Sequence, residues 1–424
     1  MKGNGPFISM CSSTTRLLCM AVLAVSTLSG CNSVLDVEPP DRVPTEQLGD
    51  PATAGLQVAS VVASFDCAFS QYVVTTGETS DELVNSNLRS AQAFEFDQRN
   101  VDPANENAAL FECDQLNAIY EPLSMELTQA EETLGQLDDW SDAEVPDRAS
   151  LVAKTLAYAG YGRILLGEAY CSAAINMSGE LGWQEILSEA EDRLSQAMQA
   201  ASDAGDEGLV NLTRVGRARV RRDLGDTTGA ITDAQAVPEG FVYVAHSNSS
   251  SPRSMNQAYR AINQNYEESV DPRFRNLAYQ GVADPRVQVE NTGQLGSGRV
   301  YEVWVQNKYP SLDTDIPMAS WDEAQLILAE LEGGQAAVDI INMFHQRAGL
   351  PDFQSQDPQE IHDHVIQERS RELFLEGQRF WDMRRFNVPY DPPPGTSYPK
   401  GGVFGDMRCF PLPNAERYNN PNIP

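Results

Sequence analysis

The sequence predicts a mainly α-helical protein in which tetratricopeptide-like helix hairpins form one scaffold, with irregular loops and a few short strands. Apolar residues recur at spacings of three and four over long stretches, as at Trp183, Ile186 and Ala190. Turns such as Gly225-Asp226 separate successive helical stretches of similar length. Segments rich in β-branched and aromatic residues are short and lie in the middle of the chain.

The N-terminus has the features of an export signal. Lys2 and Arg16 precede an apolar run over 17–28, which is too short to span a bilayer but typical of a secretory signal. The Leu-Ser-Gly-Cys run at 28–31 resembles a bacterial lipobox, which implies cleavage of signal peptide 1–30 and acylation of the Cys31 thiol. The alternative is an ordinary signal peptide with an incidental cysteine. No later segment is apolar enough to cross a membrane, so we expect a lipid anchor.

Residues 31–50 contain three prolines among polar residues, which predicts an extended tether. A single helical domain is expected over 51–424. Its first helix is predicted from 51 to about Tyr72, where the polar run 75–82 breaks the pattern. We interpret that run as a capped turn, with a ligand loop as the alternative.

The following helices are predicted from their apolar stripes. One covers Ala104–Leu137, and hairpins at 149–238 and 318–386 form the helical core. The segment Leu151–Cys171 is rich in alanine and glycine, so another helix can approach it closely. The rest is irregular: residues 239–317 are loop-rich, with strands expected at Phe241–Ala245 and Val300–Val305, and the tail 387–424 is proline-rich.

Residues 368–385 concentrate charge and aromatic side chains, with five arginines and four acids among eighteen residues. Asp357-Pro358 supplies an N-cap and a first-turn proline for the helix that enters this stretch. An anion site is one interpretation, because arginine binds anions bidentately. We favour a structural helix whose charges pair with neighbouring elements, because acids are interleaved throughout.

The same stretch follows the pattern E-R-x-R-E-L-F-x-E-G-x-R-x-W-D-x-R-R, which resembles the C-terminal signature of SusD/RagB-like proteins. Ser370 stands where arginine is common, and Phe380-Trp381 varies the usual aromatic pair. The resemblance implies a non-catalytic lipoprotein on the outside of the outer membrane. It would capture a nutrient, most often a glycan, for a SusC-like TonB-dependent transporter, with 239–317 on the ligand side. It carries over no ligand-binding residues.

The chain has a formal net charge of −31, which argues against nucleic acid or an anionic lipid surface as a partner. Cys67, Cys113, Cys171 and Cys409 follow Cys31, and an exported location permits disulfides in three connectivities. We favour Cys67 with Cys113, because both lie on neighbouring amphipathic segments. The other pairings stay open.

The sequence offers no catalytic constellation, metal site or cofactor motif. The histidines are His246, His345, His362 and His364, and we interpret them as solvated or core-edge residues. His362 and His364 point to opposite faces of a helix, unlike an i, i+4 metal pair. The protein is therefore not expected to be an enzyme.

Aromatic rings outside the helical stripes are the candidate ligand contacts, because a flat ring covers the C–H face of a sugar. The candidates are Tyr259, Tyr279, Tyr301 and Trp304. For each, packing in the core is the alternative. The competing function is a tetratricopeptide-type scaffold lipoprotein that assembles envelope proteins and binds no small ligand.

Overall fold

The computed structural model describes residues 49–88, 91–105, 112–115, 117 and 119–424. The predicted signal peptide, Cys31 and nearly all of the tether lie outside the described residues. Residues 51–424 form one compact unit. Most of its regular structure is helical, which confirms the predicted fold class.

The helices are α2 (Ala54–Thr79), α3 (Ala91–Asp97), α4 (Tyr120–Asp139), α5 (Arg148–Ala169), α6 (Trp183–Ala204), α7 (Glu207–Leu224), α8 (Thr227–Gln235), α9 (Trp321–Glu332), α10 (Gly334–Ala348), α11 (Pro358–Glu372), α12 (Arg379–Arg385) and α13 (Asn414–Asn419). Short 3₁₀ or π turns are η2 (Pro51–Thr53), η4 (Pro252–Ser254), η5 (Tyr259–Gln264) and η6 (Pro272–Phe274). The strands are β1 (Leu83–Asn85), β2 (Ser172–Ala173), β3 (Leu181–Gly182), β4 (Val242–Ala245), β5 (Glu268–Val270), β6 (Ala278–Tyr279), β7 (Val282–Ala283), β8 (Val289–Leu295), β9 (Glu302–Gln306) and β10 (Ile316–Ser320).

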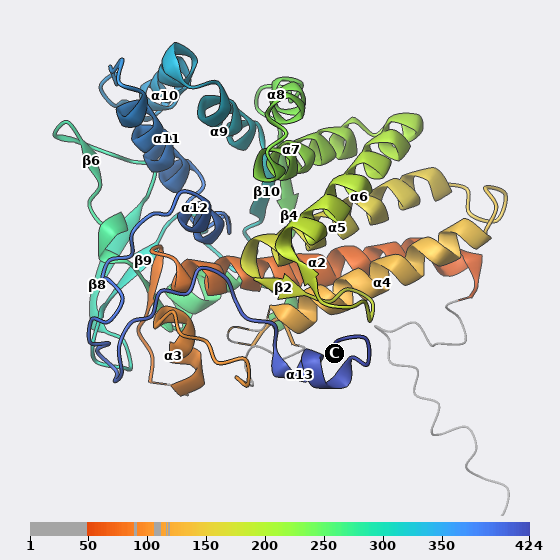
Figure 1. Cartoon of the computed structure of the whole chain (residues 1–424), viewed down its shortest axis with the longest axis horizontal. Helices are drawn as coiled ribbons and strands as arrows, with labels where there is room; N and C mark the ends of the chain where they lie inside the picture. The colour runs from red at the N-terminus through yellow and green to blue at the C-terminus, as the bar shows by residue number, and fades with distance from the viewer. Residues whose placement is uncertain (1–48, 89–90, 106–111, 116, 118) are drawn as a thin grey trace, which may run out of the picture. The chain divides into compact units, whose positions relative to one another are not determined.

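Helix α5 is central to the packing of the first helices. It contacts α2, α4 and α6, and Figure 1 shows these helices running side by side. Its glycines allow the close approach that the sequence predicts. A Cβ atom at Gly160 would lie 2.7 Å from Cγ of Leu194, and one at Gly167 would lie 2.8 Å from Cδ2 of Leu187, both on α6.

Residues at the helix ends determine where α6, α7 and α8 end and begin. Gly205 and Gly225 adopt left-handed backbone conformations at the C-termini of α6 and α7, which glycine tolerates best. The following aspartates cap the next helices: Asp206 accepts a hydrogen bond from the backbone N–H of Leu209, and Asp226 from that of Gly229.

The predicted break after Tyr72 is wrong, because α2 continues to Thr79. The hydroxyl groups of Thr76 and Thr79 donate to the carbonyls of Tyr72 and Thr75, one turn earlier, at 2.7 and 3.0 Å. These bonds let polar residues stay helical in a buried environment. The turn therefore comes later, at residues 80–82.

The expectation that no later segment could cross a membrane also needs correction. Among the described residues, Pro51–Thr79 is long and apolar enough to do so by length and composition alone. Half of its most apolar window is buried within the protein, and it packs against α4 and α5. A core helix of a water-soluble domain has the same features.

The helix expected from Ala104 is shorter than predicted. Helix α4 begins at Tyr120, and the described residues 112–115 form a turn instead. This turn carries Cys113, which is bonded to Cys67 of α2 with a Cα–Cα distance of 5.7 Å. A second disulfide joins Cys171 to Cys409 and ties the C-terminal tail to the end of α5.

The strands form two-stranded antiparallel sheets. The two expected strands correspond to β4, which pairs with β10, and β9, which pairs with β8. Strand β1 follows α2 directly and pairs with β5, so the end of α2 lies beside the loop-rich part of the chain.

The charge-dense stretch 368–385 comprises the end of α11, a turn and α12. Four of its five arginines pair with acids on other elements, as the sequence predicts, whereas Arg384 lies against Trp183 and Trp381. Arg369 is 1% exposed and binds Asp382 at 2.7 and 3.1 Å. Arg385 binds Glu330 of α9. Together these pairs fasten α12 to α11 and α9.

Candidate ligand pocket

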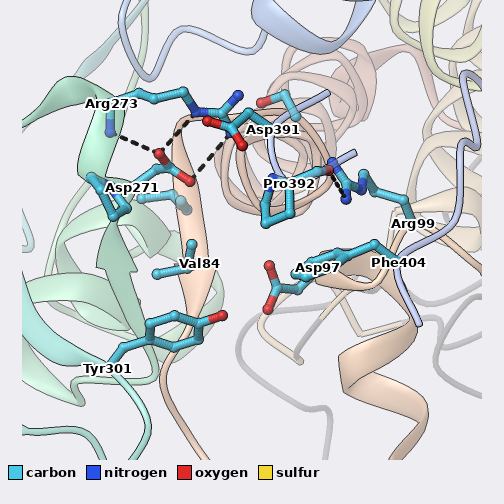
Figure 2. Close-up of a pocket in the computed structure, with 12 residues that line it drawn as sticks. Val84, Asp97, Arg99, Asp271, Arg273, Tyr301, Asp391, Pro392 and Phe404 are labelled. Atoms are coloured by element: carbon cyan, nitrogen blue, oxygen red, sulfur yellow. Dashed lines mark hydrogen bonds and ion pairs between the residues drawn. The ribbon is translucent and has the colours of Figure 1, made fainter. Parts of the chain in front are cut away.

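A cavity of about 210 Å³ lies where the end of α2, the end of α3, η6 and the C-terminal tail meet. Figure 2 shows Tyr301, Asp97 and Phe404 around it, with Arg273, Asp271 and Asp391 gathered at one side. Its lining residues are Ser80, Leu83, Val84, Asp97, Arg99, Asp271, Pro272, Arg273, Tyr301, Asp391, Pro392 and Phe404.

Arg99 forms one wall of the pocket. Its guanidinium carbon lies 4.2 Å from the ring centre of Tyr390 and 4.5 Å from that of Phe404. One terminal nitrogen donates to the carbonyl of Pro392 at 2.8 Å, while Nε is buried with no hydrogen-bond partner among the described residues. The aromatic contacts fix the plane of the guanidinium and hold a positive charge at the pocket.

Arg273 connects the pocket to the charge-dense stretch. Its backbone and side chain donate to Asp271, with Nε at 3.1 Å, and Nη1 lies 3.4 Å from Asp81. Asp81 also accepts two hydrogen bonds from Arg379 of α12, at 2.6 and 2.7 Å. Asp271 thus holds Arg273 directly, and Asp81 connects this pair to Arg379 of α12.

Asp97 is buried and accepts a hydrogen bond from the Tyr398 hydroxyl at 2.7 Å. Burial raises the pKa of Asp97 to about 6. Burial also raises the pKa of Tyr301, so its hydroxyl stays protonated at neutral pH. The pocket thus combines hydroxyl, guanidinium and carboxyl groups, which together can donate to and accept from a polyhydroxylated ligand.

The four predicted ligand aromatics do not form one surface. Tyr301 lines the pocket, whereas Tyr259 and Trp304 are partly buried against the main core. Trp304 also lies beside Arg275, 5.1 Å from guanidinium carbon to ring centre. Tyr279 packs against His345 and His364, at ring-centre distances of 4.7 and 5.3 Å.

Sequence reasoning missed most of the pocket. Asp97, Arg99 and Phe404 carry no motif, and they come from segments about 300 residues apart. Asp271 and Arg273 flank Pro272 in an Asp-Pro-Arg triplet, which by itself indicates only a turn, and η6 begins at Pro272.

A second cavity, of about 310 Å³, is lined by Trp183 and Trp381 together with Arg384 and Arg385. The two indole rings meet edge to face at 5.2 Å, and Arg384 covers both at 5.4 and 5.0 Å. Their faces are already in contact with protein groups, so this cavity is the weaker candidate for stacking on a sugar.

Comparison with known proteins agrees with the resemblance. Residues 323–423 match the SusD family. A curated SusD-like protein of Formosa agariphila is 27% identical over 159 residues, which cover 34% of this chain and 30% of that protein. The match thus spans less than a third of the relative's length.

The fold matches solved structures over nearly their whole length. A SusD superfamily protein from Bacteroides vulgatus aligns with a TM-score of 0.66 at 14% identity, covering 89% of this chain and 98% of that one. Surface glycan-binding protein A from Bacteroides thetaiotaomicron, solved with laminarihexaose, aligns with a TM-score of 0.66 at 13% identity, covering 86% and 97%. The C-terminal part of the chain thus matches the SusD family in sequence, and the chain shares its fold with these solved structures.

Proposed function

We propose that the protein is a non-catalytic, surface-exposed outer-membrane lipoprotein that binds a glycan and delivers it to a TonB-dependent transporter. The SusD-family match and the shared fold support this assignment. The observation that carries it for this chain is the pocket containing Tyr301, Arg99, Arg273 and the carboxyl groups around them.

The pocket chemistry suits a sugar. Carboxylates accept hydrogen bonds from hydroxyl groups and guanidinium groups donate to sugar oxygens, while the partly buried ring of Tyr301 offers apolar surface. A cavity of about 210 Å³ lies below the usual range for drug-sized ligands. We therefore infer that it holds one residue or one end of a glycan, with the remainder outside.

Binding to oligosaccharides tests this role. Titration calorimetry with laminarihexaose and with neutral and acidic oligosaccharides should find a ligand whose affinity falls at least tenfold in Tyr301→Ala. The matched control is Tyr418→Ala, because Tyr418 is 78% exposed and does not line the pocket. Equal affinities of the Tyr301→Ala variant and the native chain would refute the pocket assignment.

The anchor and the partner are tested separately. Mass spectrometry of the membrane-extracted protein should find an acylated N-terminal Cys31, and a Cys31→Ser variant should lose membrane attachment. Purification in mild detergent should recover a TonB-dependent barrel. Recovery of envelope-assembly proteins without a barrel would favour the scaffold alternative.

A further inference from the structure

Two histidines and a glutamate meet between α10 and α11, away from the pocket. His345 lies on α10, while His364 and Glu368 lie one turn apart on α11. Their exposed fractions are 0%, 5% and 0%. The three side chains therefore form a buried cluster that the proposed glycan binding does not use.

The three facing atoms are arranged like ligands around one ion. His345 Nε2 lies 3.2 Å from His364 Nε2 and 3.2 Å from Glu368 Oε1, and the third side of the triangle measures 3.5 Å. A tetrahedral zinc ion with bonds of 2.0–2.1 Å separates its ligand atoms by about 3.3–3.4 Å. The observed triangle thus matches one face of a zinc tetrahedron.

Neighbouring groups hold each side chain in the orientation that a metal ligand needs. His345 Nδ1 lies 2.6 Å from the carbonyl of Pro351, a bond that requires a proton on Nδ1. In neutral His345, Nε2 therefore carries the free electron pair. The ring of His364 stacks on Phe353 at 4.1 Å, and Glu368 is held by Arg286.

We propose that His345, His364 and Glu368 bind a zinc ion that ties α10 to α11. Two imidazoles and one carboxylate favour zinc over calcium or magnesium, which prefer oxygen ligands. No further His, Cys, Asp or Glu ligand atom joins this group in the part of the chain that the structure describes. A water molecule would then complete the tetrahedron.

The site explains the packing of a projecting hairpin. Tyr279, at the end of β6, lies against both histidine rings, and Figure 1 shows this hairpin beside α11. Zinc would fix the two rings on which Tyr279 rests. The ion is thus structural, and it stabilises α10, α11 and the β6–β7 hairpin as a group.

Zinc binding by the full chain, purified without a polyhistidine tag and stripped with a chelator, tests the proposal. Elemental analysis after re-addition of zinc should find one ion per chain, and the melting temperature should rise. His364→Phe keeps an aromatic ring against Phe353 but removes a ligand, so its affinity should fall at least a hundredfold. His362→Phe, two residues away on the same helix, should bind as the native chain does.

Cobalt gives a readout that does not depend on a variant folding. Cobalt bound to the native chain should show the strong visible absorption of a tetrahedral site, and zinc should displace it. Absence of both this spectrum and stoichiometric zinc would overturn the proposal. The cluster would then be held by a proton shared between His345 and Glu368. Equal zinc affinity in His364→Phe and the native chain would also overturn it.

Discussion

Removal of the Arg379 guanidinium is expected to destabilise the whole unit. Its bidentate pair with Asp81 connects α12 to the residues that follow α2, and the two side chains are only 9% and 5% exposed. Burial opposes ionisation of Asp81, but Arg379 outweighs it and lowers the pKa of Asp81. In Arg379→Ala, Asp81 keeps a buried charge whose remaining guanidinium neighbour, Arg273, lies 3.4 Å away.

The expected loss of folding free energy is about 3–5 kcal/mol, the usual cost of removing one partner of a buried ion pair. For a unit of this size the entropy of unfolding is about 0.8 kcal/mol/K, so the melting temperature should fall by about 4–6 °C. Arg379 does not line the pocket, so the folded variant should retain its glycan affinity.

Thermal unfolding followed by circular dichroism measures the shift, and Arg417→Ala is the matched control. Arg417 also forms a bidentate pair, with Glu180 at 2.9 Å, but the two side chains are 38% and 30% exposed. Its loss should cost less than about 1 kcal/mol. Equal shifts in the two variants would refute the reasoning, as would loss of glycan binding in Arg379→Ala without loss of stability.

Two further predictions concern packing and pH. Gly160→Ala should lower the free energy of unfolding by about 1–3 kcal/mol, because the new Cβ atom would overlap Leu194. The control is Gly135→Ala, on the exposed face of α4, where a Cβ atom would have no neighbour within 4 Å. Chemical denaturation should show that this control variant is as stable as the native chain or more stable. Burial raises the pKa of Glu82 to about 8, so the folded state holds a proton that the unfolded chain releases above its ordinary pKa of 4.5. The contribution of Glu82 to the free energy of unfolding is therefore lost as the pH rises from 5 to 8, by about 1 kcal/mol per pH unit. Glu82→Gln should remove this pH dependence. Parallel profiles of unfolding free energy against pH for the variant and the native chain would contradict the prediction.

Local patterns in the sequence predicted the parts of the fold that neighbouring residues control. Asp357 caps α11 by accepting from the N–H groups of Gln359 and Glu360, as the Asp-Pro pair indicated. Two predictions of helix boundaries failed, at 75–82 and at the described residues 112–115. In the first, hydroxyl groups that usually favour turns bonded within the helix instead, because the surrounding core left no water for them.

The sequence by itself determined the helical class, the hairpins and the SusD-like signature, because periodic burial and helix caps depend on residues a few positions apart. Only the tertiary structure decided which residues form the candidate sites. The pocket joins Asp97, Tyr301 and Phe404 from distant segments. His364 and Glu368 stand at i, i+4 and could have been paired from sequence, but only the packing of α10 on α11 brings His345 to them. Contacts between residues far apart in the sequence depend on how the helices and loops pack, and short-range sequence patterns carry no information about that packing.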